Sequence, residues 1–267
     1  MDGSLKLRSY QEESLNALDH ALQTSDNNPC VVLPTGSGKS LVMAEAVRRW
    51  IAGYPEFRCI ILAHRKELVK QNSEEFKRNA PGIKVGVYSA GLNRRDMDKQ
   101  VTFAGIDSVY KLGGTFEAFD IVIVDEAHRI PVRGEGKYRT FINMCKVVNP
   151  KVRVVGFTAT PFRMSCGSIC HRDHILNTVC YEANVGDLIQ QGYLCKLRSK
   201  VGKEESADIS EVKKNSGGDY IINSLASAAR KGDLVTRAVR SAIGHLRDEK
   251  RSATVWFCVD VAHCKDV

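Results

Sequence analysis

The sequence predicts an α/β fold in which helices cover both faces of a parallel β-sheet. Short apolar runs alternate with helical patterns from residue 10 to about 157, and this alternation is typical of parallel strands joined by helices. Residues 121–124 read Ile-Val-Ile-Val, and four β-branched residues in a row indicate a strand that is buried on both faces. A glycine-bearing turn at 34–40 stands between an apolar run and an amphipathic helical pattern.

The regular part of the pattern predicts six strands and four helices. The strands are expected at 30–33, 58–63, 84–88, 100–105, 121–125 and 153–158, and the helices at 10–23, 38–52, 65–78 and 137–147. Gly53 and Pro55 end the second helix, and Pro81 and Gly82 follow the third, because proline and glycine interrupt helices.

The rhythm changes after residue 163. A polar loop is expected at 164–181, a short helix at 184–191, a linker or insertion at 199–219, helices at 219–230 and 233–248, and a buried strand at 253–258. We therefore expect a first domain at 1–180, a connecting segment at 181–235 and the beginning of a truncated second domain at 236–267, because one strand is too little for a domain of its own.

Composition narrows the class of protein. The 267 residues are 43% hydrophobic and carry a net charge of +8, which favours a polyanionic partner, although a solubilising surface charge would look the same. Runs of 18 apolar residues and an apolar signal core are both absent from the sequence, so we expect no membrane span and no export. Nine scattered cysteines without a Cys-x-x-Cys pair are then expected to be reduced thiols of a cytoplasmic protein.

Residues 34–40 read Pro-Thr-Gly-Ser-Gly-Lys-Ser, which predicts a phosphate-binding loop. A glycine-bearing turn at a helix N-terminus presents backbone N–H groups to phosphate oxygens. Leu33 stands where the general pattern has its first glycine. Lys39 would reach the β- and γ-phosphates, and the Ser40 hydroxyl would bind Mg²⁺. The residues predicted to bind nucleotide in this loop are Thr35, Gly36, Ser37, Gly38, Lys39 and Ser40.

An acidic pair, Asp125 and Glu126, ends the strand predicted at 121–125. Ligands bind at the carboxyl ends of strands in open α/β sheets. Asp125 would then hold Mg²⁺ together with Ser40, and Glu126 would orient or deprotonate the attacking water. Two adjacent acids alone could equally be a solvated strand end, but the phosphate loop upstream favours catalysis. The predicted catalytic residues are Lys39, Asp125 and Glu126.

The ordered motifs resemble superfamily 2 helicases of the DEAD/DEAH type over residues 7–163. Residues 7–11, Leu-Arg-Ser-Tyr-Gln, look like the adenine-recognition element of that family, which implies that Gln11 reads the base and that Arg8 flanks the ring. Residues 63–69, Ala-His-Arg-Lys-Glu-Leu-Val, resemble its first nucleic-acid motif, with His64 and Arg65 at phosphates, although a charged helix start is an alternative.

Residues 158–163, Thr-Ala-Thr-Pro-Phe-Arg, match the coupling motif of these helicases. The resemblance implies that Thr158 and Thr160 hydrogen-bond His128 and the acidic pair, and so relay the state of the γ-phosphate. It also implies a RecA-like lobe of a P-loop NTPase. More narrowly, residues 90–92, residues 189–194 and the surroundings of Trp256 look like the RadD branch of bacterial helicases.

The resemblance implies ATP and Mg²⁺ as cofactors and nucleic acid as the partner, with DNA favoured over RNA. In this superfamily ATP lies between two RecA-like lobes, and arginines of the second lobe act on the γ-phosphate. We expect those motifs beyond Val267, so that the isolated chain would turn over poorly without a second lobe or a partner subunit. We thus expect the ATP-binding lobe of a DNA helicase or translocase. A non-catalytic nucleic-acid-binding fragment and the motor subunit of a restriction or repair assembly are the alternatives.

A cluster of Cys166, Cys170, His171 and His174 could bind zinc through four soft ligands. Its spacing is unlike that of the common zinc fingers, and Cys180 and Cys195 confuse the ligand count. We favour a solvated or partly buried loop.

Overall fold

A computed structural model describes residues 6–132, 134–163, 167–196, 207–214, 220–250 and 254–267. The chain divides into two compact units, Met1–Cys195 and Lys196–Val267, which are described separately below. The domain boundaries expected near residues 180 and 235 stay predictions.

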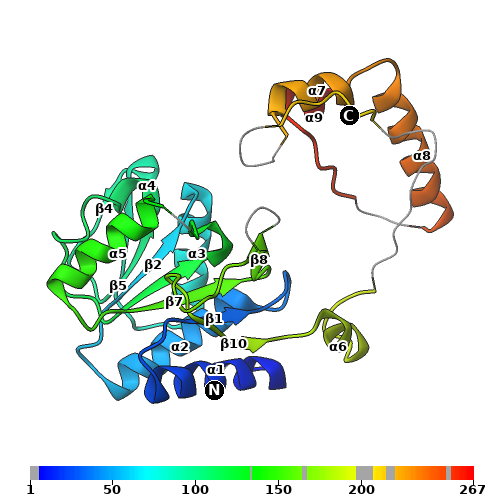
Figure 1. Ribbon diagram of the computed structural model, residues 1–267. Coiled ribbons are helices and arrows are strands. Elements are labelled where there is room, and N and C mark those ends of the chain that lie inside the picture. Colours follow the sequence, from blue (N-terminus) through cyan, green and yellow to red (C-terminus); the bar gives the residue numbers. More distant parts are fainter. Residues whose placement is uncertain (1–5, 133, 164–166, 197–206, 215–219, 251–253) are drawn as a thin grey trace. The chain divides into compact units, whose positions relative to one another are not determined.

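The first unit is built on an eight-stranded sheet with the strand order β10-β1-β7-β6-β2-β5-β3-β4 (Figure 1). All neighbouring strands are parallel except β3 and β4, which are antiparallel. The strands are β1 (Pro29–Val32), β2 (Cys59–Ala63), β3 (Val85–Ser89), β4 (Arg94–Arg95), β5 (Val101–Gly105), β6 (Ile121–Asp125), β7 (Arg153–Thr158) and β10 (Thr178–Glu182). The six predicted strands are confirmed, and their ends move by at most one residue.

Helices pack on both faces of this sheet, which confirms the predicted fold class. The helices of the first unit are α1 (Ser9–Thr24), α2 (Lys39–Gly53), α3 (Lys66–Asn79), α4 (Ile106–Val109), α5 (Lys137–Val148) and α6 (Val185–Gln190). Short 3₁₀ helices, η1 (Ala90–Leu92) and η2 (Ala127–Arg129), and a small hairpin of β8 (Phe162–Arg163) and β9 (Gly167–Ser168) complete the unit.

Two hydrophobic cores result from the alternation of side chains along each strand. In β6, Ile121 and Ile123 point into the core shared with α1, α2 and α3, whereas Val122 and Val124 point into the core shared with α5. Strands β1, β2, β5 and β6 have all their residues buried, and β3 and β7 have all but the first. This explains why they read as continuous apolar runs in the sequence.

The loop expected at 164–181 is partly wrong. Residues Thr178–Glu182 form β10, which pairs in parallel with β1 at the edge of the sheet. The strand is only partly buried, so its sequence lacks the apolar run that marks the interior strands. Its pairing with β1, far away in the chain, supplies the backbone hydrogen bonds that local sequence does not reveal.

The second unit holds α7 (Ile222–Ala229), α8 (Leu234–Asp248) and α9 (Val261–Asp266). The strand expected at 253–258 is wrong for the described residues 254–258, which form no regular element. Phe257 is 95% exposed, and no strand of the described part pairs with this run. An apolar run without a pairing partner cannot satisfy its backbone groups as a strand. Among the described residues, no helix combines the length and apolar content needed to span a bilayer.

Candidate nucleotide-binding site

Lys39 joins the phosphate turn to the acidic pair. It is the first residue of α2, and its Nζ lies 2.9 Å from Oε1 of Glu126 and 3.5 Å from Oδ1 of Asp125. Glu126 is 87 residues away in the sequence. The two motifs meet because β1 and β6 flank β7 in the parallel sheet, so that their carboxyl ends lie at the same edge.

Left-handed glycines shape the phosphate turn. Gly36 and Gly38 both have φ of +82°, a conformation that favours glycine. A Cβ on Gly38 would also lie only 2.5 Å from Nε2 of Gln11. The sequence therefore needs glycine at position 38 for two separate reasons, the torsion angle and the contact with α1.

Helix α1 supports this turn through hydrogen bonds. The Ser37 carbonyl accepts hydrogen bonds from the Tyr10 hydroxyl at 2.6 Å and from Gln11 Nε2 at 2.9 Å. The Ser37 hydroxyl donates to the Pro34 carbonyl at 2.6 Å, so this side chain is engaged within the loop. Thr35 and Gly36 are exposed, and among the described residues no side chain of α1 donates a hydrogen bond to their backbone.

Gln11, the predicted adenine reader, is buried. Its Oε1 accepts from the Arg8 backbone N–H at 3.0 Å, while its Nε2 supports Ser37. An amide oxygen and an NH₂ group can each form a second bond, so base recognition by Gln11 stays a prediction. Arg8 lies over the ring of Tyr193 at 4.9 Å, and this ring also contacts Tyr10.

Asp125 is held in a defined orientation. Its Oδ2 accepts from Nδ2 of Asn72 at 2.8 Å, and its Oδ1 accepts from the Glu126 backbone N–H at 2.9 Å. A hydroxyl from Ser40, in the first turn of α2, and a carboxylate are the hard oxygen ligands that Mg²⁺ prefers. The donor set therefore fits the predicted metal, with Lys39 beside it.

Glu126 has a strained backbone and sits beside the coupling residues. Its φ of +53° lies in the left-handed region, which is costly for a residue with a side chain and often marks functional sites. Its Oε2 lies 3.3 Å from Nδ1 of His128, and the same nitrogen lies 3.0 Å from the Thr158 hydroxyl. Burial lowers the pKa of His128, which Glu126 opposes.

The coupling motif continues this network. The Thr158 oxygen accepts from the Thr160 backbone N–H at 3.1 Å and donates to the Thr160 carbonyl at 3.1 Å. Arg163 Nε donates to the His128 carbonyl. Thr158, His128 and Glu126 thus form a continuous contact path from β7 to the acidic pair.

His64 and Arg65 lie next to the same site. Together with Glu67, Leu68, Glu126, His128 and Arg129 they line a pocket of about 510 Å³. The buried Nδ1 of His64 has no hydrogen-bond partner among the described residues, and burial, followed by Arg129 and Arg65, lowers the pKa of His64. The predicted nucleic-acid residues are therefore adjacent to the predicted catalytic ones.

The cysteine and histidine cluster does not converge in the part that the structure describes. Cys166 lies outside the described residues. The Cys170 thiol hydrogen-bonds with Cys30, which lowers the pKa of Cys170 and raises that of Cys30. His174 Nδ1 lies 3.2 Å from the Ile169 carbonyl. No group of three potential metal ligands is found within the described ranges.

The sequence reasoning missed two supporting residues, Asn72 and Tyr193. A signal existed for Asn72, because it is a polar residue on the buried face of α3, between Val69 and Phe76. Such a residue must find a polar partner. Tyr193 follows α6 in the run 189–194, and the sequence does not indicate its contact with the ring of Tyr10, which is far away in the chain.

Comparison with known proteins decides the family. Residues 4–163 match the family model ResIII, the res subunit of type III restriction enzymes. The chain belongs to the ResIII family. This match and the similarities below confirm a superfamily 2 helicase lobe with a helicase-family ATP-binding domain; the RadD-like branch stays a prediction.

Relatives of this ResIII chain include two yeast proteins. A putative ATP-dependent helicase, IRC3 of Saccharomyces cerevisiae, is 23% identical over 98% of this chain and 38% of its own length. A putative mitochondrial ATP-dependent helicase, irc3 of Schizosaccharomyces pombe, is 27% identical over 97% of this chain and 42% of its own length. The chain thus spans about two fifths of the length of these relatives.

Solved structures show the same fold. A nuclease-deletion mutant of the type ISP restriction-modification enzyme LlaGI, in complex with a DNA substrate mimic, has a TM-score of 0.54 at 15% identity, over 91% of this chain and 24% of its own. The Hef helicase domain of Pyrococcus furiosus has a TM-score of 0.52 at 20% identity, over 69% of this chain and 39% of its own.

Proposed function

We propose that this chain binds ATP and Mg²⁺ and couples ATP hydrolysis to movement on nucleic acid, with DNA favoured over RNA. The observation that carries the proposal is the contact of Lys39 with both Glu126 and Asp125. A lysine on a phosphate turn that also contacts an acidic pair marks the place where the γ-phosphate and its metal would lie. DNA helicases and DNA-bound restriction enzymes among the similar proteins support the preference for DNA.

Each residue has a role that its position supports. The backbone of residues 35–40 receives the phosphates, and Lys39 leaves the carboxylates to neutralise the phosphate oxygens. Ser40 and Asp125 would hold Mg²⁺, which supplies charge neutralisation for the transferred phosphoryl group. Glu126 is then free to orient or deprotonate water. His128 would relay the state of the γ-phosphate from Glu126 to Thr158.

The acidic pair contacts Lys39, Asn72 and His128, and no arginine side chain bonds to it within the described residues. An arginine supplied to the γ-phosphate is worth about 10³–10⁵ in turnover in related phosphoryl transfer. In the superfamily that the chain resembles, this arginine comes from a second lobe, so we infer that efficient hydrolysis needs a cation from another segment or a partner subunit. This chain alone would bind ATP weakly and hydrolyse it slowly.

The test compares Lys39→Ala with the native chain. Titration with a fluorescent ATP analogue in the presence of Mg²⁺ should show binding by the native chain and at least tenfold weaker binding by the variant. Lys66→Ala, on the neighbouring helix α3, is the matched control and should bind normally. Equal binding by Lys39→Ala and the native chain would remove the assignment.

A second measurement addresses movement on nucleic acid. ATP hydrolysis is followed with single-stranded DNA, double-stranded DNA or RNA of the same sequence. Slow turnover that rises with DNA supports the proposal. Rapid DNA-stimulated turnover by the chain alone would show that no added arginine is needed, while nucleotide-independent DNA binding without turnover would favour a non-catalytic fragment.

A further inference from the structure

A second pocket lies at the opposite edge of the sheet from Lys39. It has a volume of about 570 Å³ and is built from the beginnings of β6 and β7 and the ends of α1 and α2. In a parallel sheet the beginnings and the tips of the strands lie at opposite edges. This pocket is therefore separate from the nucleotide site and has no part in the function proposed above.

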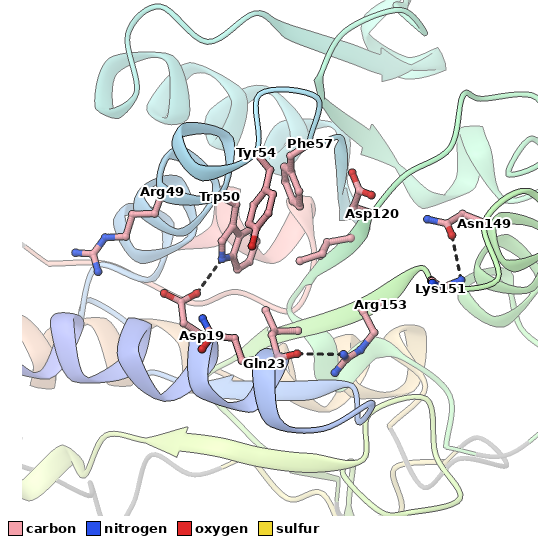
Figure 2. Close-up of a pocket in the computed structure, with 12 residues that line it drawn as sticks. Asp19, Gln23, Arg49, Trp50, Tyr54, Phe57, Asp120, Asn149, Lys151 and Arg153 are labelled. Carbon is pink, nitrogen blue, oxygen red and sulfur yellow. Dashed lines mark hydrogen bonds between the residues drawn. The ribbon is translucent and has the colours of Figure 1, made fainter.

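Aromatic side chains form one wall of the pocket (Figure 2). Trp50 and Phe57 pack with ring centroids 5.5 Å apart. The Trp50 Nε1 donates to Asp19 at 2.8 Å, which fixes the indole. Tyr54 is 72% exposed at the rim. This wall suits a large apolar side chain, because aromatic rings bury much surface at little conformational cost.

Two cations of the lining have no carboxylate partner in the described part of the chain. Arg153 donates only to backbone carbonyls, of Leu22 and Asn27, and its buried Nε has no acceptor. Lys151 is exposed, and only its backbone N–H has a bond, to Asn149. Burial lowers the pKa of the Arg153 guanidinium, which the charge of Asp26 opposes. Because neither cation is held in an ion pair in the described part of the chain, both can pair with an incoming carboxylate.

Of the remaining charges of the lining, Arg49 is ion-paired to Glu12 and Glu45. Asp120 accepts from the Arg58 backbone N–H at 2.9 Å and keeps its negative charge. Asp19 is bonded to Trp50. Two aspartates beside two cations that form no ion pair are unfavourable for a polyphosphate strand, but they tolerate a single carboxylate. This favours an acidic protein segment over nucleic acid.

Two exposed apolar side chains lie just before the lining residues in the chain. Val147 at the end of α5 is 84% exposed and Val148 is 41% exposed, and Asn149 and Lys151 of the lining follow them. A ligand that covers both the pocket and this rim must be longer than a small molecule. We propose that this surface docks an extended segment of a partner protein, in which a carboxylate stands next to a large apolar side chain.

The test uses a defined peptide and a tryptophan reporter. The chain has two tryptophans, so Trp256→Phe leaves Trp50 as the only one. The probe is an acetylated, amidated peptide, Gly-Ser-Glu-Leu-Phe-Ser-Gly. Control peptides replace Glu by Gln, or Leu-Phe by Ser-Ser. Binding is measured from Trp50 emission and, independently, from the anisotropy of a fluorescein-labelled copy.

Matched variants locate the site. Lys151→Glu and Tyr54→Ser should each weaken binding of the Glu peptide about tenfold or more, and both positions are exposed, so folding should persist by circular dichroism. Lys77→Glu on α3 makes the same charge reversal at an exposed position outside the lining, and Val185→Ser on α6 replaces another exposed apolar side chain by serine. Both should bind as the parent does. Lys39→Ala should also bind the peptide normally, which separates this inference from the nucleotide assignment.

Specific outcomes would overturn the proposal. They are no binding of the Glu peptide, equal binding of the Gln peptide, or loss of affinity in the Lys77→Glu control to the same degree. Displacement of the peptide by a single-stranded oligonucleotide, with loss of oligonucleotide binding in Lys151→Glu, would assign the surface to nucleic acid instead. Concentration-dependent dimerisation that Tyr54→Ser abolishes would assign it to a second copy of the chain.

Discussion

The side chain of Asn72 donates a 2.8 Å hydrogen bond to the carboxylate of Asp125, although the two residues are 53 positions apart in the chain. Both residues are buried, with exposed fractions of 6% each. A buried carboxylate needs such donors, because an unsatisfied buried polar group is costly. Helix α3, which holds the last four residues of the predicted nucleic-acid motif at 63–69, therefore also orients the predicted metal ligand.

Replacing Asn72 by Ala should destabilise the first unit and impair the site. The expected loss is about 1–3 kcal/mol in the free energy of unfolding, because Asp125 loses a buried donor. Urea unfolding followed by far-ultraviolet circular dichroism measures this loss, and Mg²⁺-dependent nucleotide binding should weaken as well. Gln71→Ala, on the exposed side of the same helix, should change stability by less than about 0.5 kcal/mol. Equal effects of the two substitutions would contradict the role of Asn72.

Replacing Gly38 by Ala should be harmful, whereas Gly53→Ala should not. Gly38 has φ of +82° and its added Cβ would meet Gln11, while nothing lies within 4 Å of a Cβ at Gly53. We expect a loss of about 1–3 kcal/mol for Gly38→Ala and a gain of about 0.4–1 kcal/mol for Gly53→Ala. Thermal and urea unfolding measure both. Gln11→Ala loses its own bonds to Ser37 and Arg8, but in that background Gly38→Ala should cost less, because the contact is gone and only the part that comes from the torsion angle is left.

Stability of the first unit should fall as the solution becomes acidic. Burial lowers the pKa of both His64 and His128 in the folded chain, so the unfolded chain takes up protons first. The stabilisation is present above the unfolded value of about 6.5 and is lost as the pH falls from there through the lower folded pKa values. Urea unfolding at a series of pH values should show this slope, and His64→Gln with His128→Gln should reduce it. A slope that survives both substitutions unchanged would assign the acid sensitivity to other groups.

Glu126→Gln should separate binding from hydrolysis. The amide keeps the shape of the side chain but cannot act as a base, so hydrolysis should fall by about 10²–10⁴-fold. Nucleotide binding should persist, because the phosphates would contact Lys39 and the turn rather than Glu126. Glu75→Gln on α3 serves as the control for the loss of one negative charge. Single-turnover hydrolysis alongside binding titrations measures the separation, and a parallel loss of both would indicate that Glu126 mainly positions Lys39.

The parts of the fold that could be predicted are those with local signals. The β-branched run of β6 and the apolar run of β7 revealed both strands, because strands buried on both faces exclude polar residues. The edge strand β10 could not be predicted, since its residues are only partly buried and pairing with β1 creates it. For residues 254–258 the apolar sequence predicted a strand, but the described residues offer no strand to pair with it.

The candidate site follows the same division. The motifs containing Lys39 and Glu126 could be read directly, and their meeting followed from the parallel sheet. The support given by Tyr10 and Gln11 to the Ser37 carbonyl could not, because it depends on how α1 packs against the phosphate turn. Local patterns therefore predict which groups carry chemistry, and tertiary packing determines how firmly each is held.

Helix α2 has Lys39 at its beginning and Trp50 near its end. The 11 residue steps from Lys39 to Trp50 span about 16 Å at the α-helical rise per residue, so the two sites lie apart at the two ends of one helix. A nucleotide and a docked protein segment would thus contact opposite ends of helix α2 and could bind at the same time. A partner bound at the Trp50 end would therefore stay bound while ATP binds and leaves at the Lys39 end.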